Sequence, residues 1–178
     1  GRAIGLENAS LTDILNRLTS LYAGNIGIEY KHIREAEEIE WITEKFEGRN
    51  TEYNFSIDKK KRILNKLNQA VVFEKFLGTK YVGQKRFSLE GGENTITALD
   101  AIINAAGESG SSEVVIGMAH RGRLNVLANI LGKTYDYIFG EFEGTISMES
   151  PMGDGDVKYH LGFSSQVKTP TDKEVRLY

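Results

Sequence analysis

The first part of the chain carries apolar side chains at the spacing of an amphipathic helix. Over residues 11–22 the apolar residues recur every three or four positions, which places them on one helix face. Ser10 precedes this run, Asp13 follows three positions later, and Gly24 comes just after it. A serine cap, an acidic residue in the first turn and a glycine stop are signals of helix ends. The pattern therefore predicts a helix over residues 11–22.

Two more segments show the same spacing. Residues 33–48 end on Gly48, and their many acidic residues are most simply a solvated helix face. The apolar residues expected to point inward there are Ile39, Ile42 and Phe46. Residues 56–78 hold one long helix or two short ones, with Ser56 as the cap and Gly78 as the stop.

After Gly78 the pattern changes from helices alone to helices and strands. The spacing predicts a helix over residues 93–107 and a short buried strand over 114–119, which is apolar and β-branched. Helices are expected over 121–132 and 134–142, and the tail reads as strand, turn and strand around Pro170. Helix, strand and helix in succession are typical of an α/β layer.

A single buried strand needs neighbouring strands on both sides, and the chain offers few others. We therefore expect an α/β fold with an incomplete sheet. In this interpretation residues 1–78 form a helical N-terminal region, and residues 79–178 form the start of an α/β domain.

Composition narrows the class of protein. The 178 residues have a net charge of −3, so no overall basic field indicates nucleic acid. Cysteine is absent, which excludes disulfides and thiolate metal sites. No apolar run approaches the length of a membrane span, and the first residues resemble neither a signal nor a transit peptide. These features predict a soluble globular protein, and because no Met begins the sequence we expect a piece of a longer one.

The strongest candidate for chemistry follows the predicted strand at residues 114–119. His120 and Arg121 come directly after it, and ligands of open α/β sheets bind beyond the carboxyl ends of strands. Gly122 permits a tight turn, and the N–H groups of the next helix can face an anion. Spacing alone leaves a second interpretation open, in which this is a polar turn with its arginine in solvent.

Two other regions offer less. His160 and Ser164 can form a polar cluster for a small anion, although a surface histidine beside a loop has the same pattern. His32 has no second catalytic group near it in the sequence and is interpreted as structural or solvated. The acidic pair around Asp154 lacks the later ligands of a calcium loop, and no zinc-protease, P-loop or hydrolase-elbow motif is present.

Several long segments, in order, resemble the thiamin-diphosphate-dependent 2-oxoglutarate dehydrogenase family. They are "KRFSLEGGENTITALDAIINAA", "EVVIGMAHRGRLNVLANILGK" and "GDVKYHLGFSS". Upstream, "NIGIEYKHI" and "EWITEKFE" resemble the helical region of the same family. The resemblance covers nearly the whole chain from about Leu11, and it implies that residues 79–178 begin a thiamin-diphosphate-binding α/β domain.

The resemblance also implies roles for particular residues. The histidine of "HRGR" lies in the family's active site and corresponds to His120, and the adjacent arginine, which contacts thiamin diphosphate, corresponds to Arg121. The histidine of "KYHLG" corresponds to His160, a catalytic and substrate-binding residue. Ser164 and Phe87 correspond to residues that line the same substrate pocket.

The implied reaction is oxidative decarboxylation of 2-oxoglutarate in the tricarboxylic acid cycle, with transfer of the succinyl group to a lipoyl group of a partner acyltransferase. The implied cofactors are thiamin diphosphate and Mg²⁺, whose ligands are expected outside this chain, so no metal ligand is assigned here. The implied assembly is a homodimer, in the bacterial cytoplasm or the mitochondrial matrix, without nucleic acid or membrane.

Three alternatives stay open: a 2-oxoadipate dehydrogenase, a 2-oxoglutarate decarboxylase of the same family, and a non-catalytic partner-docking module. One methylene of substrate length changes binding by only about 1–3 kcal/mol, so the reaction class is the firmer inference. As a fragment of the dehydrogenase, the chain by itself is expected to hold half a site and to be inactive.

Overall fold

The computed structural model describes residues 4–49, 54–84, 86–145 and 162–178. The chain divides into two compact units, Gly1–Phe55 and Ser56–Tyr178. No helix in the described residues is long and apolar enough to cross a membrane.

The first unit contains helices α1 (Leu11–Tyr22) and α2 (Ala36–Glu47). The predicted start of α1 is confirmed, because the Ser10 side chain accepts from the Asp13 N–H and the Ser10 N–H donates to the Asp13 carboxylate. Arg17 ties the two helices together: its Nη2 donates to the Glu47 carbonyl at 2.7 Å. Phe46 is buried between them and Gly48 ends α2, both as predicted.

The second unit is built on the long helix α3 (Ile57–Lys80), which begins at the predicted cap Ser56. The predicted stop at Gly78 is wrong, because the helix continues to Lys80 and ends at Tyr81. Gly78 instead leaves room for a neighbour: a Cβ there would lie 2.9 Å from Nη2 of Arg86. The glycine therefore marks a close approach and not a helix end.

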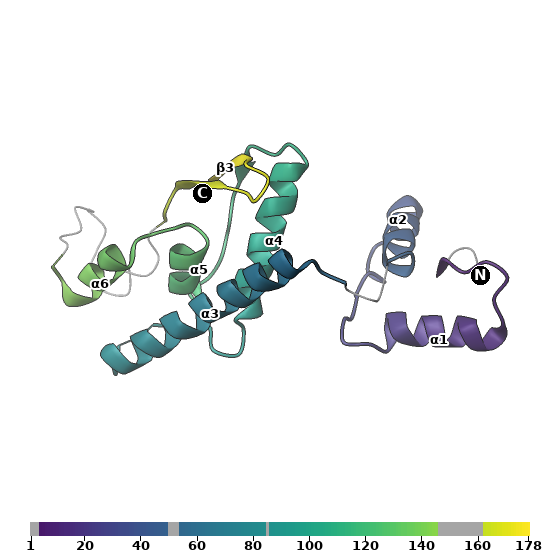
Figure 1. Ribbon diagram of the computed structural model, residues 1–178, viewed down its shortest axis with the longest axis horizontal. Helices are drawn as coiled ribbons and strands as arrows, with labels where there is room; N and C mark the ends of the chain where they lie inside the picture. The colour runs from purple at the N-terminus through teal and green to yellow at the C-terminus, as the bar shows by residue number, and fades with distance from the viewer. Residues whose placement is uncertain (1–3, 50–53, 85, 146–161) are drawn as a thin grey trace. The chain divides into compact units, whose positions relative to one another are not determined.

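Helices α4 (Asn94–Glu108) and α5 (Arg123–Asn129) both pack against α3, and α6 (Tyr135–Glu143) packs against α5 (Figure 1). Apolar residues from these helices, from the segments that connect them and from the C-terminal strand form one continuous core. Its buried members are Ala70, Phe73, Leu77, Tyr81, Leu89, Ile96, Ile103, Leu124, Val126, Leu127, Ile130, Leu131, Ile138, Val175 and Leu177.

The described residues form a small mixed sheet of β1 (Glu113–Val114), β2 (Ser165–Lys168) and β3 (Glu174–Leu177) in the order β1-β3-β2. β1 runs parallel to β3, and β2 and β3 form an antiparallel hairpin. The predicted strand, turn and strand around Pro170 are therefore confirmed, as is a mixed α/β class.

The prediction of a buried strand over residues 114–119 is wrong in its length and in its burial. Pairing ends after Ile116, whose N–H donates to the Tyr178 carbonyl. Val114, Ile116 and Met118 pack against the core, whereas Val115 between them is 78% exposed. The segment is apolar on both faces, but only one face is covered within the described residues.

The compact units divide at Phe55, and the predicted domain boundary after Gly78 stays a prediction. The reason for the division at Phe55 is packing: α3 contributes one face to the core shared with α4 and α5. The assignment of residues 79–178 to a thiamin-diphosphate-binding domain stays a prediction.

We predict that Ile96→Ala lowers the free energy of unfolding by about 2–5 kcal/mol, because truncating a buried side chain leaves a cavity. Ile96 on α4 is fully buried at 0% exposure. Ile102 on the same helix is 57% exposed, and Ile102→Ala should change the free energy by less than about 1 kcal/mol. Urea unfolding followed by circular dichroism measures both, and equal losses would contradict the described face of α4.

Candidate functional site

The turn that precedes α5 is closed by its own backbone. Gly122 has φ +73° and caps α5, and its N–H donates to the Phe87 carbonyl at 2.8 Å. The Arg123 N–H donates to the His120 carbonyl at 3.1 Å. The expectation that the start of this helix offers its first N–H groups to an anion is therefore wrong for these two amides. Side chains of the turn, and above all Arg121, are better placed to bind an anion.

Phe87 and His120 stand against each other across this turn. Their ring centroids are 4.1 Å apart with an interplanar angle of 30°. Phe87 is half-buried and His120 is exposed, so the imidazole is supported on one side and accessible to solvent. Phe87 also has φ +45°, a left-handed conformation that is unfavourable for a bulky residue and that surrounding structure must hold in place.

Arg121 lies beside them with an exposed side chain. Among the described residues its guanidinium donates one hydrogen bond, from Nη1 to the Ser88 carbonyl at 3.1 Å. A guanidinium carries five N–H donors and recognises phosphate and carboxylate in a bidentate manner. The bond to Ser88 thus fixes the direction of the side chain and leaves further donors for an anion.

Leu89 packs the segment around Phe87 against the turn around Arg121. A Cβ on Gly122 would lie 2.4 Å from the Leu89 Cδ1, so the leucine packs directly on the glycine Cα. The glycine is required twice, once for its positive φ and once for this close approach. The segment around Phe87 and the turn around Arg121 consequently behave as one packed unit.

Within the described residues, the structure does not join the other two predicted site residues, Ser164 and His160, to this cluster. Ser164 is exposed and lies immediately before β2, and no described hydrogen bond or ring contact joins it to Phe87, His120 or Arg121. His160 and Asp154 lie outside the described residues. The structure therefore brings together three of the five predicted residues and leaves the grouping of the other two as a prediction.

A buried polar network next to the site was not predicted from the sequence. Its centre is Glu74 on α3, which is 3% exposed. Its carboxylate accepts hydrogen bonds from Arg86, Ser88 and Asn125. The sequence did contain a signal for this network. Glu74 falls on the same helix face as the apolar residues Phe73 and Leu77, which are buried.

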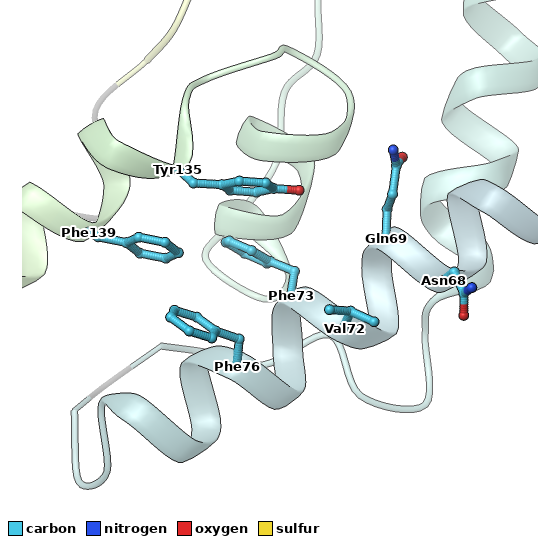
Figure 2. Close-up of a pocket in the computed structure, with 7 residues that line it drawn as sticks. All are labelled: Asn68, Gln69, Val72, Phe73, Phe76, Tyr135 and Phe139. Atoms are coloured by element: carbon cyan, nitrogen blue, oxygen red, sulfur yellow. The ribbon is translucent and has the colours of Figure 1, made fainter.

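An apolar groove of about 400 Å³ lies between α3 and α6. Figure 2 shows Phe73, Phe76, Tyr135 and Phe139 turned toward one another across it, and the ring centroids of Phe76 and Phe139 are 4.9 Å apart. Its other lining residues are Asn68, Gln69 and Val72. These lining residues include no group suited to acid–base work near neutral pH, so the turn at His120 remains the candidate site.

The chain is similar over most of its length to parts of longer curated proteins. It is 51% identical over 165 residues to the 2-oxoglutarate dehydrogenase E1 component of Cupriavidus necator, which covers 93% of this chain and 17% of that protein. The E1 component of Brucella canis is 48% identical over 163 residues, covering 91% of this chain and 16% of that protein. The match confirms the resemblance. This chain is homologous to a segment of 2-oxoglutarate dehydrogenase E1 components.

A third relative extends the comparison. The multifunctional 2-oxoglutarate metabolism enzyme of Mycolicibacterium vanbaalenii is 53% identical over 158 residues, or 89% of this chain and 13% of that protein. The chain thus spans about one seventh of the length of these three relatives. No protein-family model matches it.

We predict that Gly122→Ala lowers the free energy of unfolding by about 2–4 kcal/mol, from left-handed strain and the clash with Leu89. Gly132→Ala is the matched control, because Gly132 has φ +74° but no atom lies within 4 Å of the position that its new methyl group would occupy. Its loss should be only about 1–2 kcal/mol. Chemical denaturation measures both variants, and equal losses would show that Leu89 moves aside freely.

Proposed function

We propose that this chain forms part of a 2-oxoglutarate dehydrogenase E1 component and contributes one side of its active site. The observation that carries the proposal is the cluster of Phe87, His120 and Arg121. These three residues come from two segments that are well separated in sequence, yet a ring contact and hydrogen bonds bring them to one surface. By the sequence resemblance, the same three positions correspond to residues of the family's active-site motifs.

The residues present fit thiamin diphosphate. Arg121 offers an exposed guanidinium whose direction is fixed by Ser88, which suits a diphosphate group. When bound, the cofactor supplies the electron sink for decarboxylation. The Mg²⁺ that accompanies the diphosphate requires oxygen ligands, and we assign none of them to this chain.

His120 is proposed to hold or donate a proton near the reacting carbon of the substrate. A histidine imidazole can act as a general acid or base, and this one is exposed and lies against the Phe87 ring. The phenylalanine ring therefore restricts the orientation of the imidazole. His160 and Ser164 are proposed to bind the carboxylates of 2-oxoglutarate through their imidazole and hydroxyl groups.

The wider assignments follow from the same proposal. The product acyl group is a succinyl unit, which passes to a lipoyl group on a partner acyltransferase, and the full enzyme acts as a homodimer. The sequence similarity to bacterial enzymes supports a bacterial cytoplasmic location.

A second candidate is a 2-oxoglutarate decarboxylase with further activities. The observation that favours it is the 53% identity to a relative named as multifunctional in 2-oxoglutarate metabolism. Both candidates use the same first chemical step, so they assign the same roles to Arg121 and His120. Product analysis separates them: release of succinic semialdehyde without a lipoyl acceptor supports the decarboxylase.

We predict that Arg121→Ala, made in the full-length enzyme, raises the KM for thiamin diphosphate about 10- to 100-fold. The reason is the loss of charge-assisted hydrogen bonds, each of about 1.5–3 kcal/mol. Steady-state rates of 2-oxoglutarate-dependent ferricyanide reduction across a cofactor titration give the KM. Arg34→Ala, an exposed arginine in the first unit, is the control and should leave it unchanged. An unaltered KM in Arg121→Ala would favour a partner-docking module without a cofactor role.

We predict that His160→Ala raises the KM for 2-oxoglutarate about tenfold or more, because a hydrogen bond to a substrate carboxylate is lost. The KM for thiamin diphosphate should stay near that of the parent. His32→Ala is the matched control, since His32 is exposed in the first unit. If His160→Ala and His32→Ala give the same substrate KM, the assignment of His160 is wrong.

A further inference from the structure

The buried carboxylate of Glu74 joins the two segments that carry the candidate site. Its Oε2 accepts from the Arg86 Nη1 and from the Ser88 Oγ, both at 2.8 Å. Its Oε1 accepts from the Asn125 Nδ2 at 3.1 Å. Arg86 and Ser88 belong to the segment before α4, and Asn125 belongs to α5. One side chain of α3 therefore holds both segments.

The donors stand directly next to the site residues. Arg86 and Ser88 flank Phe87, whose positive φ of +45° requires an external constraint. Hydrogen bonds on both neighbours of Phe87 supply that constraint. The carbonyl of Ser88 in turn accepts from Arg121, so a single residue separates the Glu74 carboxylate from the guanidinium.

Packing alone does not explain a carboxylate at this position. Glu74 lies on the inward face of α3 with Phe73 and Leu77, where an apolar side chain of similar size would fill the space. Burying a carboxylate costs several kcal/mol before its partners compensate, and replacing buried ion pairs with apolar residues is often neutral or stabilising. What an apolar residue cannot do is orient Arg86, Ser88 and Asn125.

Gly78 serves the same arrangement. It lies one helical turn after Glu74, and a Cβ there would come within 2.9 Å of the Arg86 Nη2. A glycine inside a helix costs about 1 kcal/mol relative to alanine. Two positions of α3, one turn apart, are thus fitted to the guanidinium of Arg86.

We propose that Glu74 is a positioning residue, which holds Phe87 and Arg121 in the geometry that binds thiamin diphosphate. The inference rests on the proposed function, in which Arg121 contacts the cofactor. Glu74 itself is buried and is not proposed to contact the cofactor. Its effect passes through the Ser88 carbonyl to Arg121, and through both neighbours of Phe87 to the ring that supports His120.

The test is Glu74→Gln in the full-length enzyme, which keeps the shape of the side chain and removes its charge. We expect the KM for thiamin diphosphate to rise about tenfold, because hydrogen bonds to a buried charge are lost or misdirected. The kcat at saturating cofactor should fall less than threefold. A purely structural defect would lower kcat through a smaller folded fraction and leave the KM unchanged, which would overturn the proposal.

Asp100→Asn is the matched control. The Asp100 carboxylate on α4 accepts from both Nε and Nη2 of Arg62 at 2.7 Å, so the variant also weakens a charged pair anchored on α3. It leaves Arg86 and Ser88 untouched. We expect lower thermal stability with an unchanged KM for thiamin diphosphate. A rise equal to that of Glu74→Gln would show that any loosening of α3 weakens cofactor binding, and would overturn the proposal.

A double-mutant cycle with Arg121→Ala tests whether Glu74 acts on cofactor binding through Arg121. If Glu74 acts through Arg121, adding Glu74→Gln to Arg121→Ala should raise the KM less than about twofold further, because interacting residues are not additive. Fully multiplicative effects would contradict that path. If Arg121→Ala alone leaves the KM unchanged, the proposed function fails. If Arg121→Ala raises the KM and Glu74→Gln does not, only the positioning inference fails.

Gly78→Ala keeps the test available if Glu74→Gln does not fold. The added methyl displaces the Arg86 guanidinium, keeps the Glu74 carboxylate and improves helix propensity. We expect a stability below that of the parent, because loosening the buried Arg86–Glu74 pair outweighs a gain of about 1 kcal/mol in helix propensity. The KM for thiamin diphosphate should be about two- to fivefold higher, because one of the Glu74 hydrogen bonds is displaced. A parental KM in this variant would count against the proposal.

Discussion

A carboxylate removed from water must be surrounded by hydrogen-bond donors, and this requirement at Glu74 organises the second unit of the protein. The donors come from the segment before α4 and from α5, so satisfying one charge fixes both against α3. The network continues through Asn125, whose Oδ1 accepts from the Asn129 Nδ2 at 2.7 Å, and Tyr135 on α6 donates to Asn129. Apolar packing supplies the stability of this unit, and the polar network specifies its geometry.

In the candidate site, the residues that support the turn are different from the residues that are exposed to a ligand. Leu89, Gly122 and the backbone hydrogen bond between Phe87 and Gly122 are buried or internal, and they cannot touch a ligand. His120 and Arg121 are exposed, and each has a contact that directs it: His120 lies against the Phe87 ring, and Arg121 donates to the Ser88 carbonyl. Such an arrangement lowers the entropy lost when an anion binds, because the receiving groups are already oriented.

Features that depend on neighbouring residues in sequence were predictable. Caps at Ser10 and Ser56, the end of α2 at Gly48 and the C-terminal hairpin follow from local hydrogen bonds and backbone preferences. The motif around His120 could be identified as a candidate site because its residue types and its place after an apolar segment are local properties. Features that depend on distant partners were not: Gly78 has the sequence context of a helix stop, but Arg86 returns to occupy the space beside it.

The sequence by itself determined the helices, the class of the fold and the identity of His120, Arg121 and Phe87 as candidate residues. Tertiary structure decided that the Phe87 ring lies against His120 and that Arg121 donates to the Ser88 carbonyl. It likewise decided that the Gly122 and Arg123 amides at the start of α5 are hydrogen-bonded to backbone carbonyls. It also decided that α3 belongs with the second unit and that the strand before His120 has one covered face. The physical reason is the sequence distance over which each interaction acts. Capping and periodicity depend on a few neighbouring residues, whereas the burial of Glu74 depends on contacts among three segments that are distant in sequence.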